Sequence, residues 1–574
     1  MSGDIQVLQL PGEGMAIQDV PGQSASAGHV RDEIKQAYDF IVCGAGAAGG
    51  VVASQLAENP DVQVLLIEAG GDECVPQVAD SRIWMQNIGS ERDWQFLSEP
   101  CEALNGRTPP LPMGKVLGGG SSVNGLIWAR GHRNDFEEWA KAAADPEWSY
   151  EAVLEVYKRI ECWDGPADPQ RRGSNGPFYL TRPKSPNPVA LALCEAGSAL
   201  GIPAVQDLNG EAMEGGGAGG IPNVPVSGTH ERVSVATAYI RPRMAQTNLT
   251  VLLNTCVEQV LVKDSRAVGV RIRRQAMPGR DGGSRGGSYG GSYGRSYGKP
   301  RDIAVRHEVI LSLGAINTPK VLMLSGIGDR RELSAHAIEL VQHLPGVGKN
   351  FQDHILVAGC CWEYPSPQAP RNNSAEYTFF AKSDPALMTP DLQPVLEECA
   401  FGSEVTRRQY ALPDDPSHAW TLAPGLVRPH SRGQISITGN RFSDPVRIDA
   451  RFLSDERDIS ALLKGIALCR EMGNSSGMKE FVKREIMPGP LAPEKMLDFL
   501  RNAAGTYFHQ TCTAKMGTDD MSVVDSRLRV YGIRGLRVAD GSIMPAITTG
   551  NTMAPCVMIG QRAADMLRKD NGLD

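Results

Sequence analysis

The chain has 574 residues, of which 41% are hydrophobic and 22% are charged, an ordinary balance for a globular protein. At about 150 residues per domain this length allows up to roughly four domains, or two larger α/β units. A chain this long buries enough apolar surface to fold without disulfides or a structural metal. Fibrous, wholly disordered and small disulfide-rich classes are therefore excluded.

The charge and cysteine content point away from several kinds of partner. The net charge of −8 argues against nucleic-acid binding, which needs a clustered basic surface. The twelve cysteines include no C-x-x-C pair and no Cys/His group with zinc spacing, so we predict reduced thiols, no metal site and a cytoplasmic location. Residues 1–30 lack a charged segment followed by an apolar one, so no secretory signal is expected.

From residue 38 the pattern becomes that of a β-α-β unit. Residues 38–43 are an apolar run typical of a buried strand, and Gly-Ala-Gly-Ala-Ala-Gly follows at 44–49. A helix-compatible segment continues to residue 57, and residues 62–67 form a second apolar run that ends at Glu68. Glycines and polar residues interrupt the low-charge run at 40–57, so we do not interpret it as a membrane span.

This pattern favours dinucleotide binding over a chance glycine turn. Gly44 allows a tight turn, Gly46 lets the backbone approach a pyrophosphate, and Gly49 lets the helix pack closely on the strand. The helix N-terminus faces the phosphate charge, and Glu68 is placed to accept hydrogen bonds from a ribose.

A segment at 278–300 is rich in Gly, Ser and Tyr and lies between strand-like stretches at 257–274 and 303–313. Its composition cannot build a core, so we predict a flexible, tolerated insertion at a hairpin tip. Contact of its Tyr and Arg side chains with a partner is the alternative.

Five further segments identify a family resemblance. They are glycine-dense or His-containing stretches at 114–131, 314–328, 344–354, 509–517 and 540–551. Together they closely resemble the glucose-methanol-choline (GMC) oxidoreductase family over residues 38–567, with motifs closest to choline dehydrogenase-like and alcohol dehydrogenase members. The resemblance selects FAD as the dinucleotide.

The resemblance implies an α/β fold in which a Rossmann-like FAD-binding domain is joined to a substrate-binding domain on a mixed or antiparallel sheet covered by helices. We expect an N-terminal extension at 1–37, a discontinuous FAD domain at 38–157, 233–353 and 505–574, and a substrate domain at 158–232 and 354–504. The loop at 118–124 is expected beside the flavin, and Asp540 with Gly541 at its phosphate or ribitol region. The full set of expected cofactor residues is Gly44, Gly46, Ala47, Ala48, Gly49, Glu68, Ala69, Gly118, Gly119, Ser121, Asn124, Gly125, Val257, Asp540, Gly541, Thr552 and Met553.

The resemblance also implies the catalytic residues. Alcohol oxidation by hydride transfer to flavin N5 leaves a hydroxyl proton to be removed, and a histidine of ordinary pKa suits that task. His509 matches the family's catalytic histidine and is the expected general base. Asn551 stands at the family's second position, where an amide can hydrogen-bond the alcohol oxygen. Asn551 is also well suited to cap the following helix, and the two roles are compatible.

Two departures from relatives that oxidise choline bear on the pocket. Val123 stands where some of them carry a histidine bonded covalently to FAD, so we expect non-covalent FAD. Asn551-Thr-Met replaces their Asn-Pro-Asn, which weakens the case for a choline-like pocket. The aromatic residues that would cage a trimethylammonium group are more easily explained as core residues; they are Trp362, Tyr364, Tyr377 and Phe379.

We therefore predict an FAD-dependent oxidoreductase that converts a small alcohol to an aldehyde or ketone, with oxygen, a quinone or another carrier as electron acceptor. A hydroxynitrile lyase-like enzyme and a light-driven fatty-acid decarboxylase share the scaffold and are the alternatives. The presence of both His509 and Asn551 argues against a non-catalytic flavoprotein.

Overall fold

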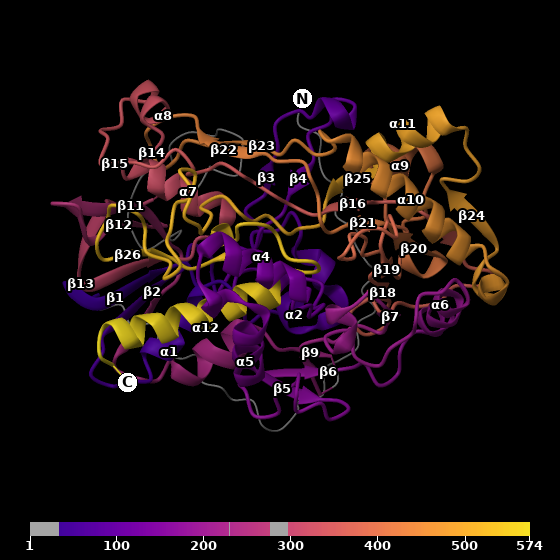
Figure 1. Cartoon of the computed structure of the whole chain (residues 1–574), viewed down its shortest axis with the longest axis horizontal. Coiled ribbons are helices and arrows are strands. Elements are labelled where there is room, and N and C mark those ends of the chain that lie inside the picture. Colours follow the sequence, from indigo (N-terminus) through magenta and orange to yellow (C-terminus); the bar gives the residue numbers. More distant parts are fainter. Residues whose placement is uncertain (1–33, 229, 276–296, 574) are drawn as a thin grey trace.

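A computed structural model describes residues 34–228, 230–275 and 297–573 (Figure 1). Residues 1–33 of the predicted N-terminal extension lie outside the described residues, and so do residues 278–296 of the predicted insertion.

A seven-stranded sheet forms one end of the molecule and is assembled from three separated stretches of chain. Its order is β10-β2-β1-β13-β12-β11, and β26 pairs with the C-terminal residues of β13. The pairs among β10, β2, β1, β13 and β26 are parallel, whereas β12 and β11 add antiparallel strands. The strands are β1 (Ala37–Cys43), β2 (Val64–Ile67), β10 (Leu249–Leu252), β11 (Thr255–Lys263), β12 (Arg266–Arg274), β13 (Arg301–Leu311) and β26 (Leu536–Val538).

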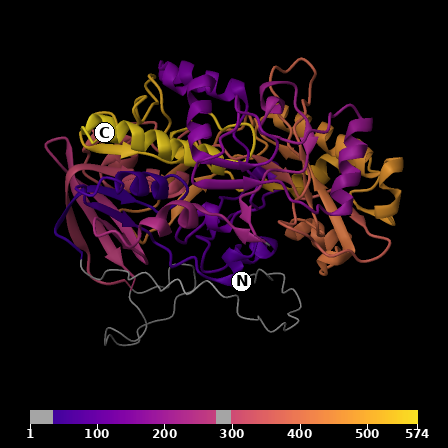
Figure 2. The ribbon, with the colours of Figure 1, turned by 90° about the horizontal axis from the view of Figure 1, so that it is seen from below.

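The β-α-β unit predicted from the sequence is present. All four residues of β2 are buried, as are the last four of β1, which explains why both read as continuous apolar runs. Helix α1 (Gly49–Leu56) connects them. The C-terminal helix α12 (Met553–Asp570) packs against α1, and a Cβ on its Gly560 would lie only 2.5 Å from the Ala48 carbonyl oxygen (Figure 2).

The stretch predicted as one strand at 257–274 is instead a tight hairpin. Asp264 and Ser265 have φ of 49° and 56° and turn the chain between β11 and β12. Asp-Ser lacks the glycine that usually marks such a turn, so the sequence pattern did not reveal it. β12 and β13 pair antiparallel, and Gln275 pairs with Tyr297. The chain on either side of the predicted insertion is therefore paired.

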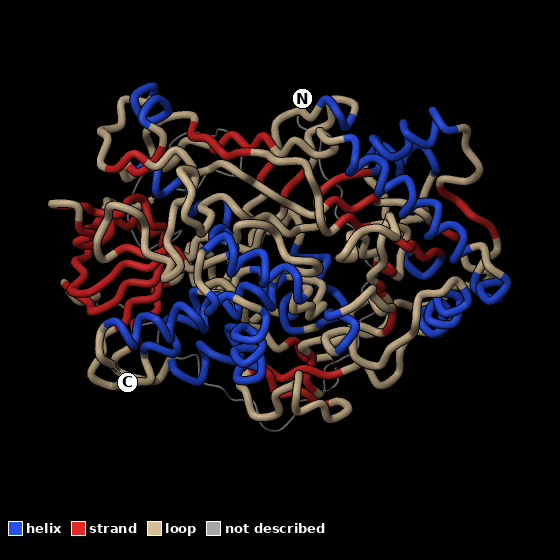
Figure 3. Tube along the Cα trace, in the orientation of Figure 1, coloured by secondary structure: helices blue, strands red, loops and turns tan. Residues whose placement is uncertain are grey.

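A six-stranded antiparallel sheet forms the other end of the molecule (Figure 3). Helices α6 (Pro188–Ala199), α10 (Glu456–Gly473) and α11 (Pro493–Ala503) contribute side chains to its core. In order, its strands are β24 (Arg484–Met487), β17 (Cys361–Glu363), β20 (Ala419–Ala423), β19 (Val395–Glu397), β18 (Thr378–Phe379) and β7 (Gly219–Gly220).

A small antiparallel sheet brings distant segments together between the two ends. Its strands are β21 (Gly425–Leu426), β16 (Ile355–Val357) and β25 (Ala504–Thr506), in that order. Ile355 pairs with Thr506, which places Asp353 and His354, just before β16, beside residues 507–510, just after β25.

The predicted α/β fold class is thus confirmed: a Rossmann-like unit is joined to a second unit built on an antiparallel sheet covered by helices. The domain boundaries stay a prediction. The other longer helices are α4 (Arg133–Ala143), α5 (Tyr150–Ile160), α7 (Gly314–Leu324) and α9 (Glu404–Tyr410). Within the described ranges, no helix combines the length and apolar character needed to cross a bilayer.

Candidate functional site

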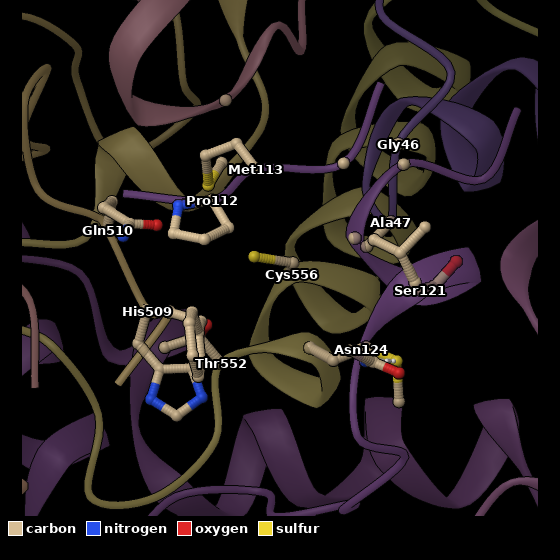
Figure 4. A pocket seen from close by; sticks show the side chains of 18 of the residues that line it. Gly46, Ala47, Pro112, Met113, Ser121, Asn124, His509, Gln510, Thr552 and Cys556 are labelled. Carbon is tan, nitrogen blue, oxygen red and sulfur yellow. Dashed lines mark hydrogen bonds between the residues drawn. The ribbon is translucent and has the colours of Figure 1, made fainter. Parts of the chain in front are cut away.

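A cavity of about 1790 Å³, its open mouth included, lies between the two ends of the molecule. The glycine turn after β1 forms one wall, and residues 507–510 form another. Figure 4 shows Gly46 and Ala47 on one side of this space and His509 on the opposite side, with the Cys556 side chain of α12 pointing into it. The segments expected to hold FAD and those expected to perform catalysis therefore share one cavity.

The three glycines of the turn occupy three different environments. A Cβ on Gly44, whose φ is +99°, would lie 2.2 Å from the Ser312 carbonyl oxygen, and one on Gly49 would lie 2.0 Å from the Gly44 carbonyl oxygen. A Cβ on Gly46 would meet nothing within 4 Å. Gly44 and Gly49 are thus required for packing, whereas Gly46 leaves room in the cavity for a ligand to approach the backbone.

Glu68 directly follows β2 at the cavity wall and is 6% exposed. Its Oε2 accepts a hydrogen bond from the Ala45 amide (3.0 Å) and its Oε1 accepts one from the Gly70 amide (2.8 Å). Burial raises the pKa of this carboxyl to about 7. Each oxygen keeps a second lone pair for a ribose hydroxyl.

Most of the predicted cofactor residues line the cavity. Those that do are Gly44, Gly46, Ala47, Ala48, Glu68, Ala69, Gly119, Ser121, Asn124, Gly125, Asp540, Gly541, Thr552 and Met553. Gly49, Gly118 and Val257 are not part of its wall. Gly118, with φ of +85°, shapes the adjacent loop, and the Val257 side chain packs in the core on β11.

Asp540 connects two loops of the cavity wall. Its Oδ2 accepts hydrogen bonds from the Gly314 amide (2.9 Å) and the Thr318 hydroxyl (2.6 Å), and its Oδ1 accepts one from the Ser542 amide (2.8 Å). These bonds fix the start of α7 against the C-terminal segment.

His509 lies at the centre of a polar network at the other wall. Its Nε2 is 3.2 Å from Asn551 Nδ2, and its Nδ1 is 2.9 Å from His354 Nδ1. The Asn551 Oδ1 accepts a hydrogen bond from Gln393 Nε2 (2.9 Å), so the amide NH₂ of Asn551 faces His509. His509 Nε2 must then carry the lone pair, and its Nδ1 the proton donated to His354.

The titration of His509 differs from the sequence-based expectation. We expected an ordinary histidine, whereas burial lowers the pKa of His509 to about 3. Burial, followed by repulsion from His509, also lowers the pKa of His354 well below its usual value. The imidazole of His509 is therefore neutral throughout the physiological pH range.

Asn551 does not cap the helix that follows it. Thr552 occupies the N-cap position of α12, and no side chain caps that helix. The Asn551 side chain contacts His509 and Gln393 instead. The capping role is therefore not observed, and the active-site role stays a prediction.

Several residues that position His509 were not singled out from the sequence. Asp353 Oδ1 accepts a hydrogen bond from the His509 amide (2.9 Å), and its Oδ2 accepts one from the Thr506 hydroxyl (2.5 Å). The Tyr507 ring stacks on His509 with centroids 4.9 Å apart. Asp353 and His354 lie in the 344–354 motif, which could have drawn attention to them; no comparable sequence signal marks Gln393 or Tyr507.

The aromatic residues considered for a trimethylammonium cage belong to the core. Trp362, Tyr364, Tyr377 and Phe379 are at most 4% exposed and pack in the core of the six-stranded sheet. None of them lines the cavity.

Three features of the cavity wall fit FAD. Gly46 lets a ligand approach the backbone, the Glu68 carboxyl after β2 can bind a ribose, and His509 with Asn551 offers hydrogen-bonding groups on the opposite wall. Models of the GMC oxidoreductase family match residues 38–356 and 429–560.

Curated relatives and solved structures agree. The chain is 35% identical to glucose dehydrogenase [FAD, quinone] of Drosophila pseudoobscura pseudoobscura over 96% of this chain and 90% of the relative. It is 33% identical to the oxygen-dependent choline dehydrogenase of Brucella anthropi over 92% and 95% of the respective chains. Pyridoxine 4-oxidase from Mesorbium loti superposes with a TM-score of 0.84 at 28% identity, covering 93% of this chain and 99% of that one.

Together with the cavity, these matches show that the chain belongs to the GMC oxidoreductase family and is an FAD-dependent oxidoreductase.

Proposed function

We propose that the enzyme oxidises the CH–OH group of an alcohol to an aldehyde or ketone, with non-covalent FAD. The observation that carries this proposal is the pairing of His509 with Asn551 in the cavity, where an amide N–H of Asn551 faces the Nε2 lone pair. An alcohol hydroxyl that enters between them exchanges this bond for one with each group. FAD, when bound, supplies the hydride acceptor. Val123 lines the cavity and offers no group for a covalent bond to the cofactor.

Each side chain has a defined task in this proposal. His509 Nε2 accepts the hydroxyl proton, and Asn551 Nδ2 donates a hydrogen bond to the alcohol oxygen as negative charge develops on it. The hydrogen bond from His509 Nδ1 to His354 and the bond from the His509 amide to Asp353 hold the ring in place. At 8% exposure, His509 is largely shielded from bulk water.

The relatives support the same reaction class. Glucose and choline, which appear in the names of two relatives, both carry hydroxyl groups, as does pyridoxine in the name of the structural neighbour.

The proposal is tested by mixing the FAD-loaded enzyme anaerobically with a panel of alcohols and following the absorbance of the oxidised flavin. Bleaching by a class of alcohols is expected, and admitting air then shows whether oxygen is the acceptor. Full FAD occupancy with no bleaching by any alcohol, combined with cleavage of a cyanohydrin, would replace the proposal with the lyase alternative.

We also propose a cytoplasmic location. All twelve cysteines are free thiols, which is the state that a reducing compartment maintains.

A further inference from the structure

One carboxyl in the cavity wall has no assigned role. Glu397 is the last residue of β19 and is 6% exposed. Side chains alternate along a strand, and here Val395 and Glu397 line the cavity whereas Leu396 packs in the core of the six-stranded sheet.

Glu397 differs from the other acids of the cavity wall in having no partner. Its Oε2 is buried without a hydrogen bond to any described residue. By contrast, backbone amides donate to Glu68, Asp93 and Asp540. The carboxyl groups of these three acids thus accept hydrogen bonds from the protein backbone, whereas Glu397 Oε2 can accept one from a ligand.

The surroundings of Glu397 make an unpaired carboxylate costly. The neighbouring wall is formed by Ile127, Ala375, Val395 and Tyr507, which cluster together. Burial alone raises the pKa of Glu397 to about 8. Arg92, the arginine in the cavity wall, already donates a hydrogen bond to Asn87. A buried carboxyl of this kind is stabilised when a cation that donates hydrogen bonds arrives beside it.

We infer that Glu397 is a specificity-determining residue that binds a protonated amine on the substrate, so that the preferred substrates are amino alcohols. This inference rests on the proposed function, because the hydroxyl group of the same molecule is placed at His509 and Asn551. An N–H-bearing amine suits the site better than a quaternary ammonium, because it can donate hydrogen bonds to the buried Glu397 Oε2, which has no donor among the described residues.

The kinetic test uses the holoenzyme with ω-amino-1-alkanols of increasing length, each compared with the 1-alkanol in which a methyl group replaces the ammonium. We expect kcat/KM to favour the amino alcohol. Glu397→Gln should lower that value by roughly tenfold to a hundredfold, mainly through KM, and leave the 1-alkanols within about twofold. Equal use of both series by the wild type would overturn the inference while leaving alcohol oxidation intact.

A matched control removes a carboxylate from the same sheet outside the cavity. Glu363 on β17 hydrogen-bonds with Lys483 and Arg484, so Glu363→Gln should leave the preference for amino alcohols unchanged. Loss of the preference in this variant would mean that general charge, and not the cavity contact, governs the selectivity, and would overturn the inference.

A binding measurement separates this inference from the proposed reaction. Hexylamine has no hydroxyl group, and calorimetry should show that it binds the wild-type holoenzyme and binds Glu397→Gln at least about tenfold more weakly. If no alcohol bleaches the flavin but this difference appears, the proposed reaction fails and the amine site stands. Undetectable binding of hexylamine to the wild type would refute the amine site.

Discussion

At the scale of single residues, the protonation of His509 is set by its neighbours. The donors of Asn551 face its Nε2, and its Nδ1 is directed at His354. Burial then holds the pKa of His509 to about 3. This pKa makes His509 a weaker base than a solvated histidine, but its lone pair is not lost to protonation near neutral pH.

The pH dependence follows from the sign of this shift. A general base acts in its neutral form, and a lowered pKa moves the loss of that form to more acidic solutions. Between about pH 8 and about pH 5, the rate of flavin reduction should therefore show no fall due to His509. Rapid mixing of enzyme and alcohol across this range measures that rate. A decline with a midpoint near that of an ordinary histidine would contradict the assigned environment.

Asn551 offers a second test at this scale. Asn551→Ala removes the amide that is aimed at the developing negative charge and should lower kcat by roughly a hundredfold to a thousandfold. Steady-state kinetics measure this, with FAD content checked by absorbance. Asn502→Ala, on α11 where the side chain bonds Asp498, is the control and should leave kcat unchanged. A normal kcat for Asn551→Ala would remove Asn551 from the mechanism.

At the scale of elements, the turn between β1 and α1 separates the requirements of folding from those of binding. A methyl group on Gly46 would stand in open space, whereas one on Gly44 or Gly49 would collide with backbone. Gly46→Ala should leave the thermal stability of the apoprotein nearly unchanged and weaken FAD binding by roughly tenfold or more. Gly44→Ala and Gly49→Ala should each destabilise the fold by about 2 kcal/mol or more.

Thermal unfolding of the apoproteins and fluorescence titration with FAD make this comparison. Unweakened FAD binding by Gly46→Ala would show that the cofactor does not approach the backbone at that turn.

The elements also show what the sequence could predict. The β-α-β unit rests on contiguous residues, so its strands, helix and glycine roles are readable from local pattern. The network around His509 is not readable from local pattern. His354 precedes β16 and meets His509 through the pairing of β16 with β25, whereas Gln393 precedes β19 in another sheet and reaches the network through Asn551. No sequence motif surrounds Glu397. Its place in the cavity wall becomes visible only in the structure, where it and the core-facing Leu396 point to opposite sides of β19.

At the scale of the whole molecule, one chain passes between the two ends several times. Three separated stretches supply the seven-stranded sheet, and the network around His509 lies in the wall of the cavity to which both ends contribute residues. The motifs, read together as a family resemblance, predicted this overall plan. The hairpin at Asp264 and Ser265 was missed because its turn residues are atypical.

The insertion provides a test at this scale. Residues 275 and 297 pair across the hairpin, so replacing 276–296 with Asn-Gly should preserve the strands. Because loop-closure entropy changes slowly with length, stability should change by less than about 2 kcal/mol, and turnover should be unaffected. Denaturant unfolding and steady-state assays check both. Loss of turnover with stability intact would assign the segment a role in function.

Anaerobic flavin reduction in His509→Ala shows whether His509 removes the alcohol proton. We expect this variant to retain FAD fully and to be reduced at least roughly a hundredfold more slowly than the wild type. His418→Ala, which alters a half-exposed histidine paired with Asp415, should reduce its flavin at the wild-type rate. A wild-type rate in His509→Ala would show that His509 is not the base.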